Sequence, residues 1–285
     1  MLGIYLSLVG AVILVFADVL KKQFSSEHPF EIVVWNTVLV GIFFAAAACL
    51  IAGAQVLDAA AFIWLPLTIV LLIAGEITFI KSLTLGDLSE VAPLRAVSPV
   101  FSVLFALLVL GEFPTPLALG GVALVVSGVW FITPRPAGSQ VRVLSKAARY
   151  MILSQFIGVL MGITIKIASA GISPLIYFLC CLLGELAYFS IIIQRKKFDA
   201  WALYKSKPAA TLTMGSLWGV GLVAVSIAPA YTLVAYAYAS SQIYLPVAML
   251  VSAYVLKERQ VSKRILPMLL LLCGVILVIF GAAVK

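Results

Sequence analysis

Charged residues are scarce in this chain: they form 11% of its 285 residues, whereas a soluble domain carries about 25%. Histidine occurs once, and the four cysteines lie inside apolar runs with no histidine nearby. The shortage of charge excludes an ordinary soluble domain, and the lack of histidine and cysteine clusters argues against a metal site or a disulfide framework. A Walker phosphate-binding motif is also missing, so we expect neither a built-in ATPase nor a cofactor.

Continuous apolar runs are what the chain has in abundance. Hydrophobic residues make up 64% of it, and its mean hydropathy is +1.20. Runs of about 20 apolar residues can cross a bilayer as helices, whereas a transmembrane barrel needs short alternating segments. We therefore predict an all-α integral membrane protein with ten transmembrane helices. The expected spans are 2–22, 31–52, 61–83, 91–110, 117–133, 148–169, 173–193, 209–231, 235–256 and 265–283.

Two prolines and two glutamates recur at nearly the same spacing. Pro99 and Pro246 are 147 positions apart, and Glu112 and Glu258, which close the same two apolar runs, are 146 apart. This register indicates that one half of the protein was duplicated. Because five spans per half is an odd number, the second copy must cross the membrane in the opposite direction, so we predict an inverted repeat. The expected units are 1–133 for the first five-helix repeat, 134–147 for a basic, proline-containing linker and 148–285 for the second repeat.

The net charge of +8 is concentrated in short loops between the expected spans. Lysine and arginine are absent from the loops at 53–60 and 111–116 but frequent in their second-half counterparts, 194–208 and 257–264. Under the positive-inside rule the basic loops face the cytoplasm, which places both termini on the other side of the inner (plasma) membrane. The expected partners are therefore the lipid bilayer and a small-molecule substrate, with no nucleic acid.

The segment from Ser82 to Phe101 resembles the EamA-type members of the drug/metabolite transporter superfamily. The closing Gly-Glu and Lys-Glu pairs of the two proline-marked spans, and the glycine-containing span after each, extend the resemblance over the whole chain. The chain departs from the family where Ile13 and Leu14 replace a frequent Trp-Gly pair, and where Asn36 replaces a frequent arginine. The resemblance implies a secondary transporter, often an exporter, of small metabolites such as amino acids, or of drugs.

Charged side chains inside the expected spans are the first functional candidates, because each costs about 3 kcal/mol in hydrocarbon. Equal numbers of acids and bases would allow all of them to form structural ion pairs. Glu76 and Glu185 lie deep in their spans, and a carboxyl group there could take up and release protons during antiport. Alternatively, Arg95 or Lys166 fixes these glutamates with no proton traffic. The candidates for proton coupling or a buried ion pair are Asp18, Glu76, Lys81, Lys166 and Glu185.

Arg95 is the main candidate for substrate binding. It lies between Pro93 and Pro99, which interrupt helical hydrogen bonding, and irregular helix in a membrane is tolerated mainly where it lines a cavity. Its guanidinium could bind a carboxylate or phosphate through two hydrogen bonds. The alternatives are an ion pair with Glu90 or Glu76 that fixes the span, or extension of the side chain to the membrane surface.

The second half has no arginine at the matching place. It offers Gln242 and Tyr244 before another helix-breaking proline, Pro246, although tyrosines near a span end often form an interfacial aromatic belt. Trp35 and Asn36 are weaker candidates for substrate binding. An aromatic, half-polar pocket opposite the arginine would suit an amino acid or a related zwitterion or anion.

These features favour a secondary carrier working by alternating access, with its site formed by spans 1, 3, 4, 6, 8 and 9. An enzyme is not expected, because an intramembrane enzyme would require a histidine, a paired aspartate motif or a metal cluster in the spans. A flippase for a lipid-linked substrate and a multidrug efflux carrier remain alternatives. Glycines in the fifth and tenth spans permit close packing between the halves or between subunits, so both a monomer and a homodimer are compatible with the sequence.

Overall fold

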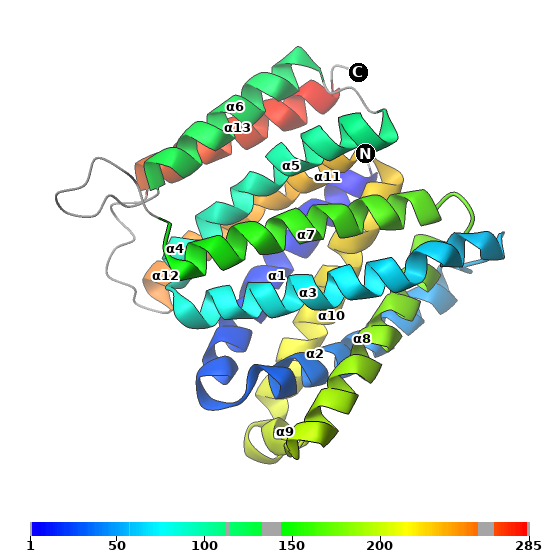
Figure 1. Cartoon of the computed structure of the whole chain (residues 1–285). Helices are drawn as coiled ribbons and strands as arrows, with labels where there is room; N and C mark the ends of the chain where they lie inside the picture. Colours follow the sequence, from blue (N-terminus) through cyan, green and yellow to red (C-terminus); the bar gives the residue numbers. More distant parts are fainter. Residues whose placement is uncertain (1, 57, 112–114, 133–143, 256–264, 284–285) are drawn as a thin grey trace.

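A computed structural model describes residues 2–56, 58–111, 115–132, 144–255 and 265–283, and these residues form a bundle of helices (Figure 1). The first half contains α1 (Leu2–Glu27), α2 (Phe30–Ile51), η1 (Ala59–Trp64), α3 (Leu65–Leu85), α4 (Leu88–Val91), η2 (Ala92–Val97), α5 (Ser98–Phe105), the π-helical η3 (Ala106–Leu110) and α6 (Pro116–Ile132). The second half contains α7 (Lys146–Ala168), α8 (Pro174–Lys196), α9 (Ala202–Ser206), α10 (Pro208–Tyr231), α11 (Val234–Ser240), η4 (Ser241–Ile243), α12 (Tyr244–Tyr254) and α13 (Ile265–Ala283).

Apolar length supports membrane spanning for most of these helices. Within the described residues, seven helical stretches are long and apolar enough to cross a bilayer, and α6 and α13 contain shorter apolar helices. The prediction of an all-α, multi-pass membrane protein is confirmed at this level. The count of ten spans and the inverted relation between the halves stay predictions. Glu112, Glu258 and residues 134–143 of the expected linker lie outside the described residues.

The helices pack in pairs that join the two halves of the chain. α1 packs along α10, α3 along α7, α2 along α8, α5 along α11, and α6 along α13. The α6–α13 pair lies at one edge of the bundle and α8 lies toward the opposite edge (Figure 1). The largest core cluster includes residues of α1, α2, α3, α7, α8, α10 and α12, so the two halves share one hydrophobic core.

Glycine permits the close approach of α1 and α10. A Cβ atom added at Gly10 would lie 2.7 Å from the carbonyl oxygen of Gly221, and one added at Gly221 would lie 2.9 Å from that of Gly10. Such distances are shorter than van der Waals contact, so any larger residue would push the helices apart. Both glycines are therefore required by the packing rather than by backbone conformation.

Charged groups gather at one end of the bundle, where α1, α3 and α8 end and α7 and α10 begin. Lys196 pairs with Glu31 at 2.5 Å, and Lys207 with Glu27 at 2.8 Å. Nearby, hydrogen bonds from the Lys205 ammonium and from the Trp201 backbone N–H lower the pKa of the Asp199 carboxyl. The opposite end, where α1 begins and α2 and α7 end, is joined by backbone hydrogen bonds between the segments before η1 and after α7.

Two of the expected spans are irregular, and each irregular stretch ends two or three residues before a proline of the repeat. In the first half η2, a 3₁₀ segment, precedes Pro99, and in the second half η4, also 3₁₀, precedes Pro246. Pro93 lies inside η2 itself. Because proline has no N–H to donate, and clashes with the preceding turn, the chain tightens or bends there.

Candidate functional site

A cavity of about 140 Å³ lies at the centre of the bundle. Its lining comes from six elements, three in each half of the chain: α1, α3 and η2, and α7, α10 and α11. These correspond to spans 1, 3, 4, 6, 8 and 9 of the sequence prediction. Leucines, Phe79 and Trp218 supply apolar and aromatic walls, and the polar lining residues are Asp18, Glu76, Arg95, Ser154, Gln155, Ser226 and Tyr238.

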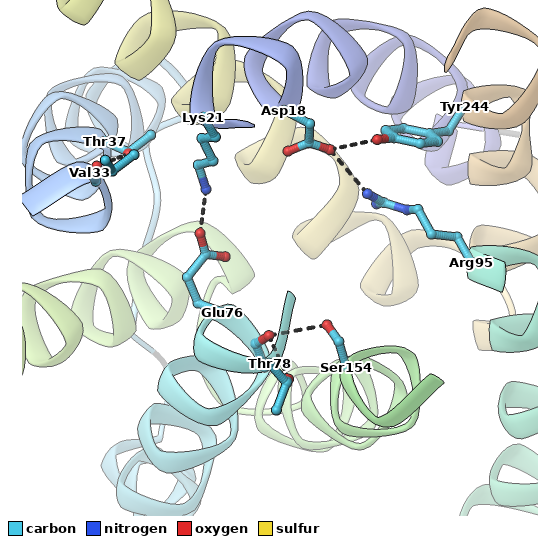
Figure 2. Close-up of polar contacts among 10 residues, drawn as sticks. Asp18, Lys21, Val33, Thr37, Glu76, Thr78, Arg95, Ser154 and Tyr244 are labelled. Carbon is cyan, nitrogen blue, oxygen red and sulfur yellow. Dashed lines mark hydrogen bonds and ion pairs between the residues drawn. The ribbon is translucent and has the colours of Figure 1, made fainter. Parts of the chain in front are cut away.

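Lys21 and Glu76 form an ion pair between α1 and α3, beside the cavity (Figure 2). The Lys21 side chain is fully buried, whereas 11% of the Glu76 side chain is exposed. The Lys21 ammonium also lies 4.6 Å from the centroid of the Trp218 ring, which attracts a cation through its π face. An ion pair held in a low-dielectric interior is strongly coupled, so removing either partner leaves an uncompensated charge.

Asp18, which lies one turn before Lys21 on α1, forms a second ion pair with Arg95. Arg95 donates to the Asp18 carboxylate at 3.2 Å, and the Tyr244 hydroxyl donates to the same oxygen at 2.9 Å (Figure 2). The Arg95 guanidinium stacks 4.0 Å from the Tyr244 ring centroid and 5.2 Å from that of Phe79. The arginine is therefore neutralised by Asp18 and held against two aromatic rings, which fixes its position at the cavity wall.

Glu185 on α8 lies behind the first pair. It is fully buried, and neither carboxyl oxygen has a hydrogen-bond partner among the described residues. Glu76 and Lys21 are the charged groups that act on it electrostatically. The side chain does not line the cavity.

The other two basic candidates lie near opposite ends of the bundle. Lys166 donates to the backbone carbonyl of Thr232 at 2.9 Å, near the end of α7 opposite the charged loops. The Lys81 ammonium lies 5.7 Å from the Tyr150 ring centroid, near the charged end. Neither lysine lines the cavity. Lys21 and Arg95 are the cations of the two ion pairs beside the cavity.

The remaining candidates for substrate binding lie outside the cavity lining. Gln242 donates to Ser98 at 3.0 Å and to the Tyr238 carbonyl at 2.9 Å, which ties η4 to α5. Trp35 donates to Ser190 at 2.9 Å, and Asn36 donates to a carbonyl of its own helix and to that of Ala200. These contacts join α2 to α8 and to the loop after it. Tyr244 contributes through Asp18 and Arg95 and is not itself a lining residue.

Lys21 is the residue that sequence reasoning missed. The sequence prediction ends the first span at residue 22, which would put Lys21 at the membrane surface. The helix instead runs to Glu27, because neither glycine nor proline interrupts it before Pro29. That longer helix carries Lys21 inside the bundle, and the uninterrupted stretch before Pro29 was the available signal.

Comparisons with known proteins agree with this architecture. A model of the EamA-like transporter family matches residues 1–133, and a model of the family described as "Sugar transport protein" matches residues 74–285. One solved crystal structure superposes with a TM-score of 0.71 at 16% identity, covering 98% of this chain and 98% of that one, a likeness that concerns the fold. A comparison with curated proteins gives no match. Because the second family model covers well over half of the chain, the chain belongs to the sugar transport protein family of drug/metabolite-transporter type, and it is a multi-pass membrane transporter.

Proposed function

We propose that the central cavity is the substrate site of a secondary active transporter that works by alternating access. The observation that carries the proposal is the position of the two ion pairs. Both lie inside the helix bundle, and residues of both line a cavity to which each half of the chain contributes three elements. Transporters with repeated halves commonly place their substrate site between the repeats near the bilayer midplane.

Charge balance and size indicate the substrate class. Within the cavity lining, Asp18 is neutralised by Arg95, and Glu76 by Lys21, so a substrate with no net charge would leave this balance intact. Sites for drug-sized ligands usually enclose about 300–1,000 Å³. A cavity of about 140 Å³ favours a small metabolite over a large drug molecule. We therefore propose a small, polar, net-neutral solute such as an amino acid zwitterion.

A sugar is the second candidate, and two observations favour it. The matching family model bears the description "Sugar transport protein". In addition, a zwitterion would need to displace internal partners of Asp18, Glu76 or Arg95, whereas a sugar needs only hydroxyl and amide contacts and an aromatic wall. Ser154 and Gln155 could supply the hydroxyl and amide contacts, and Trp218 the aromatic wall.

Counterflow in proteoliposomes tests the proposal. Purified protein is reconstituted, loaded with an unlabelled amino acid or sugar, and diluted into the labelled compound, with and without a pH gradient. Accumulation of at least one class is expected, and it should be lost in Trp218→Ala but kept in Ser127→Ala. Ser127 is an exposed residue of α6, and its hydroxyl donates to the Ala123 carbonyl of its own helix. Absence of counterflow for both classes, together with reorientation of a lipid probe, would contradict it and favour a flippase.

We further propose ten spans in two inverted five-helix repeats. If the halves are related by a two-fold axis, each span exchanges places with the span five places later, so α1 exchanges with α7 and α3 with α10. This exchange converts the α1–α10 pair into the α7–α3 pair, and it leaves the pairs α2–α8, α5–α11 and α6–α13 unchanged. All of these pairs occur, as expected from a two-fold relation between the halves. The basic residues gather at the end away from the start of α1, which supports termini outside the cytoplasm. A fluorescent protein fused to the C-terminus should therefore stay dark, and bright cytoplasmic fluorescence would reverse this orientation.

A further inference from the structure

Glu185 has no part in the substrate site, yet its surroundings are unusual. Its carboxyl oxygens are buried without a hydrogen-bond partner among the described residues. The charged and titratable groups around it are Glu76 from α3, Lys21 from α1, and Cys181 on its own helix. Burying an ionised carboxylate without a partner costs far more than burying a protonated one. Glu185 therefore carries a proton in this arrangement.

The charge count of the whole cluster leads to the same result. Three carboxyl groups share two cations, and each cation is already paired with one carboxylate: Lys21 with Glu76, and Arg95 with Asp18. The cluster is electrically neutral only if the third carboxyl group, Glu185, is protonated. A buried cluster with one carboxyl group in excess is a binding site for one proton.

Lys21 is placed to serve either glutamate. Its ammonium has three N–H donors, and among the described residues Glu76 is its hydrogen-bond acceptor. The ammonium also acts electrostatically on Glu185, and the face of Trp218 lies beside it. Glu76 lines the cavity, whereas Glu185 does not. An exchange of Lys21 between them would link a carboxyl group open to the cavity with one closed off from it.

We propose that Lys21, Glu76 and Glu185 form a proton-exchange triad. The role of this triad in coupling protons to transport rests on the proposed function. In one state Lys21 pairs with Glu76 while Glu185 is protonated. In the other state Lys21 pairs with Glu185 while Glu76 is protonated. Between the two, an O–H bond of Glu185 breaks and an O–H bond of Glu76 forms, directly or through water, while the ammonium keeps its protons. Charge is conserved, one proton moves, and Lys21 acts as a positioning residue.

Infrared spectroscopy of the purified protein at neutral pH tests the triad without any substrate. A protonated carboxyl group gives a C=O stretching band that shifts in D₂O. The band is expected in the wild type and should be lost in Glu185→Gln. The band should also be lost in Glu76→Gln. In this variant Lys21 pairs with Glu185, so the Glu185 carboxyl group gives up its proton although the residue itself is unchanged. Persistence of the band in Glu76→Gln would overturn the exchange.

Two more variants complete the experiment. Lys21→Met removes the shared cation, so a second protonated carboxyl group, that of Glu76, should add to the band; an unchanged band would overturn the role of Lys21. Glu31→Gln, a buried glutamate paired with Lys196 outside the cavity, is the matched control and should leave the band unchanged. Because no transport is measured, the band pattern tests the triad separately from counterflow, which tests the proposed function.

Discussion

The two irregular spans share a backbone feature but differ in the chemistry that they present. In each, a 3₁₀ segment ends two or three residues before a proline, and the two prolines are 147 positions apart. In the same register Arg95 of η2 corresponds to Gln242 of η4. Arg95 reaches the cavity and pairs with Asp18, whereas Gln242 turns away from the cavity and bonds to Ser98.

This difference shows that proline determines the tightened backbone, whereas the neighbouring side chains determine which polar group faces the cavity. The tightened helix follows from the missing N–H and the bulk of proline, so it can persist in both copies. The polar group that the break presents depends on its neighbours across the bundle. The Asp18 carboxylate of α1 binds Arg95 of the first copy, whereas in the second copy it accepts from Tyr244 and not from Gln242. We therefore expect a functionally asymmetric site, with its charge supplied by η2 and an aromatic group, Tyr244, supplied by α12.

The largest effect on stability and transport should come from removing the positive charge of Arg95, in the first copy of the repeat. Arg95→Gln makes η2 resemble η4 and leaves the buried Asp18 carboxylate without its cation, which costs about 3–5 kcal/mol for pairs of this kind. We expect a clearly lower unfolding temperature in detergent and loss of counterflow. Asp18→Asn combined with Arg95→Gln should be less destabilised than the sum of the two single variants; strict additivity would contradict the pairing.

An intermediate effect is expected at Tyr244. Tyr244→Phe keeps the ring against Arg95 but removes the hydroxyl that donates to Asp18, a bond to a charged group worth about 1.5–3 kcal/mol. Thermal unfolding should show a moderate loss, and counterflow should continue at reduced apparent affinity. If Tyr244→Phe matched the wild type in both measurements, the tyrosine would contribute through its ring alone.

The smallest effect is expected at the counterpart of the arginine. Gln242→Leu removes the neutral hydrogen bonds of the amide nitrogen together with a buried amide oxygen that has no partner among the described residues. The loss and the gain nearly cancel, so stability should change by about 1 kcal/mol or less. Substrate affinity in counterflow should be unchanged. A loss as large as that of Arg95→Gln would show that the two copies are equivalent after all.

Most of the fold could be predicted because lipid imposes a simple rule on the chain. Backbone groups must be satisfied within each span, so continuous apolar runs indicate helices almost directly. The expected spans accordingly coincide with the observed helices within a few residues, except that α1 extends five residues past the expected end. Helix ends are less predictable, because a helix can continue into polar residues beyond the membrane.

The partners of the buried charges could not be predicted from the sequence. It shows that Asp18, Glu76 and Arg95 need partners, but Asp18 and Arg95 are 77 positions apart, and Lys21 and Glu76 are 55 apart. Which acid meets which base depends on the rotation of each helix and its neighbours. The same holds for Trp35 and Asn36, whose helix turns them toward α8 and the following loop rather than the cavity.

The glycine contact between α1 and α10 has a consequence for how such a carrier could move. With Gly10 against Gly221, sliding of one helix past the other would bring larger side chains into backbone contact, so the two should travel as one rigid body. Any opening and closing would then occur across the cavity, between this body and the α3–α7 pair. The Lys21–Glu76 pair lies on that boundary, because it joins α1 to α3, and the Asp18–Arg95 pair joins α1 to the neighbouring η2. The ion pairs would thus hold the moving parts of the protein together in this conformation and would have to break when they separate.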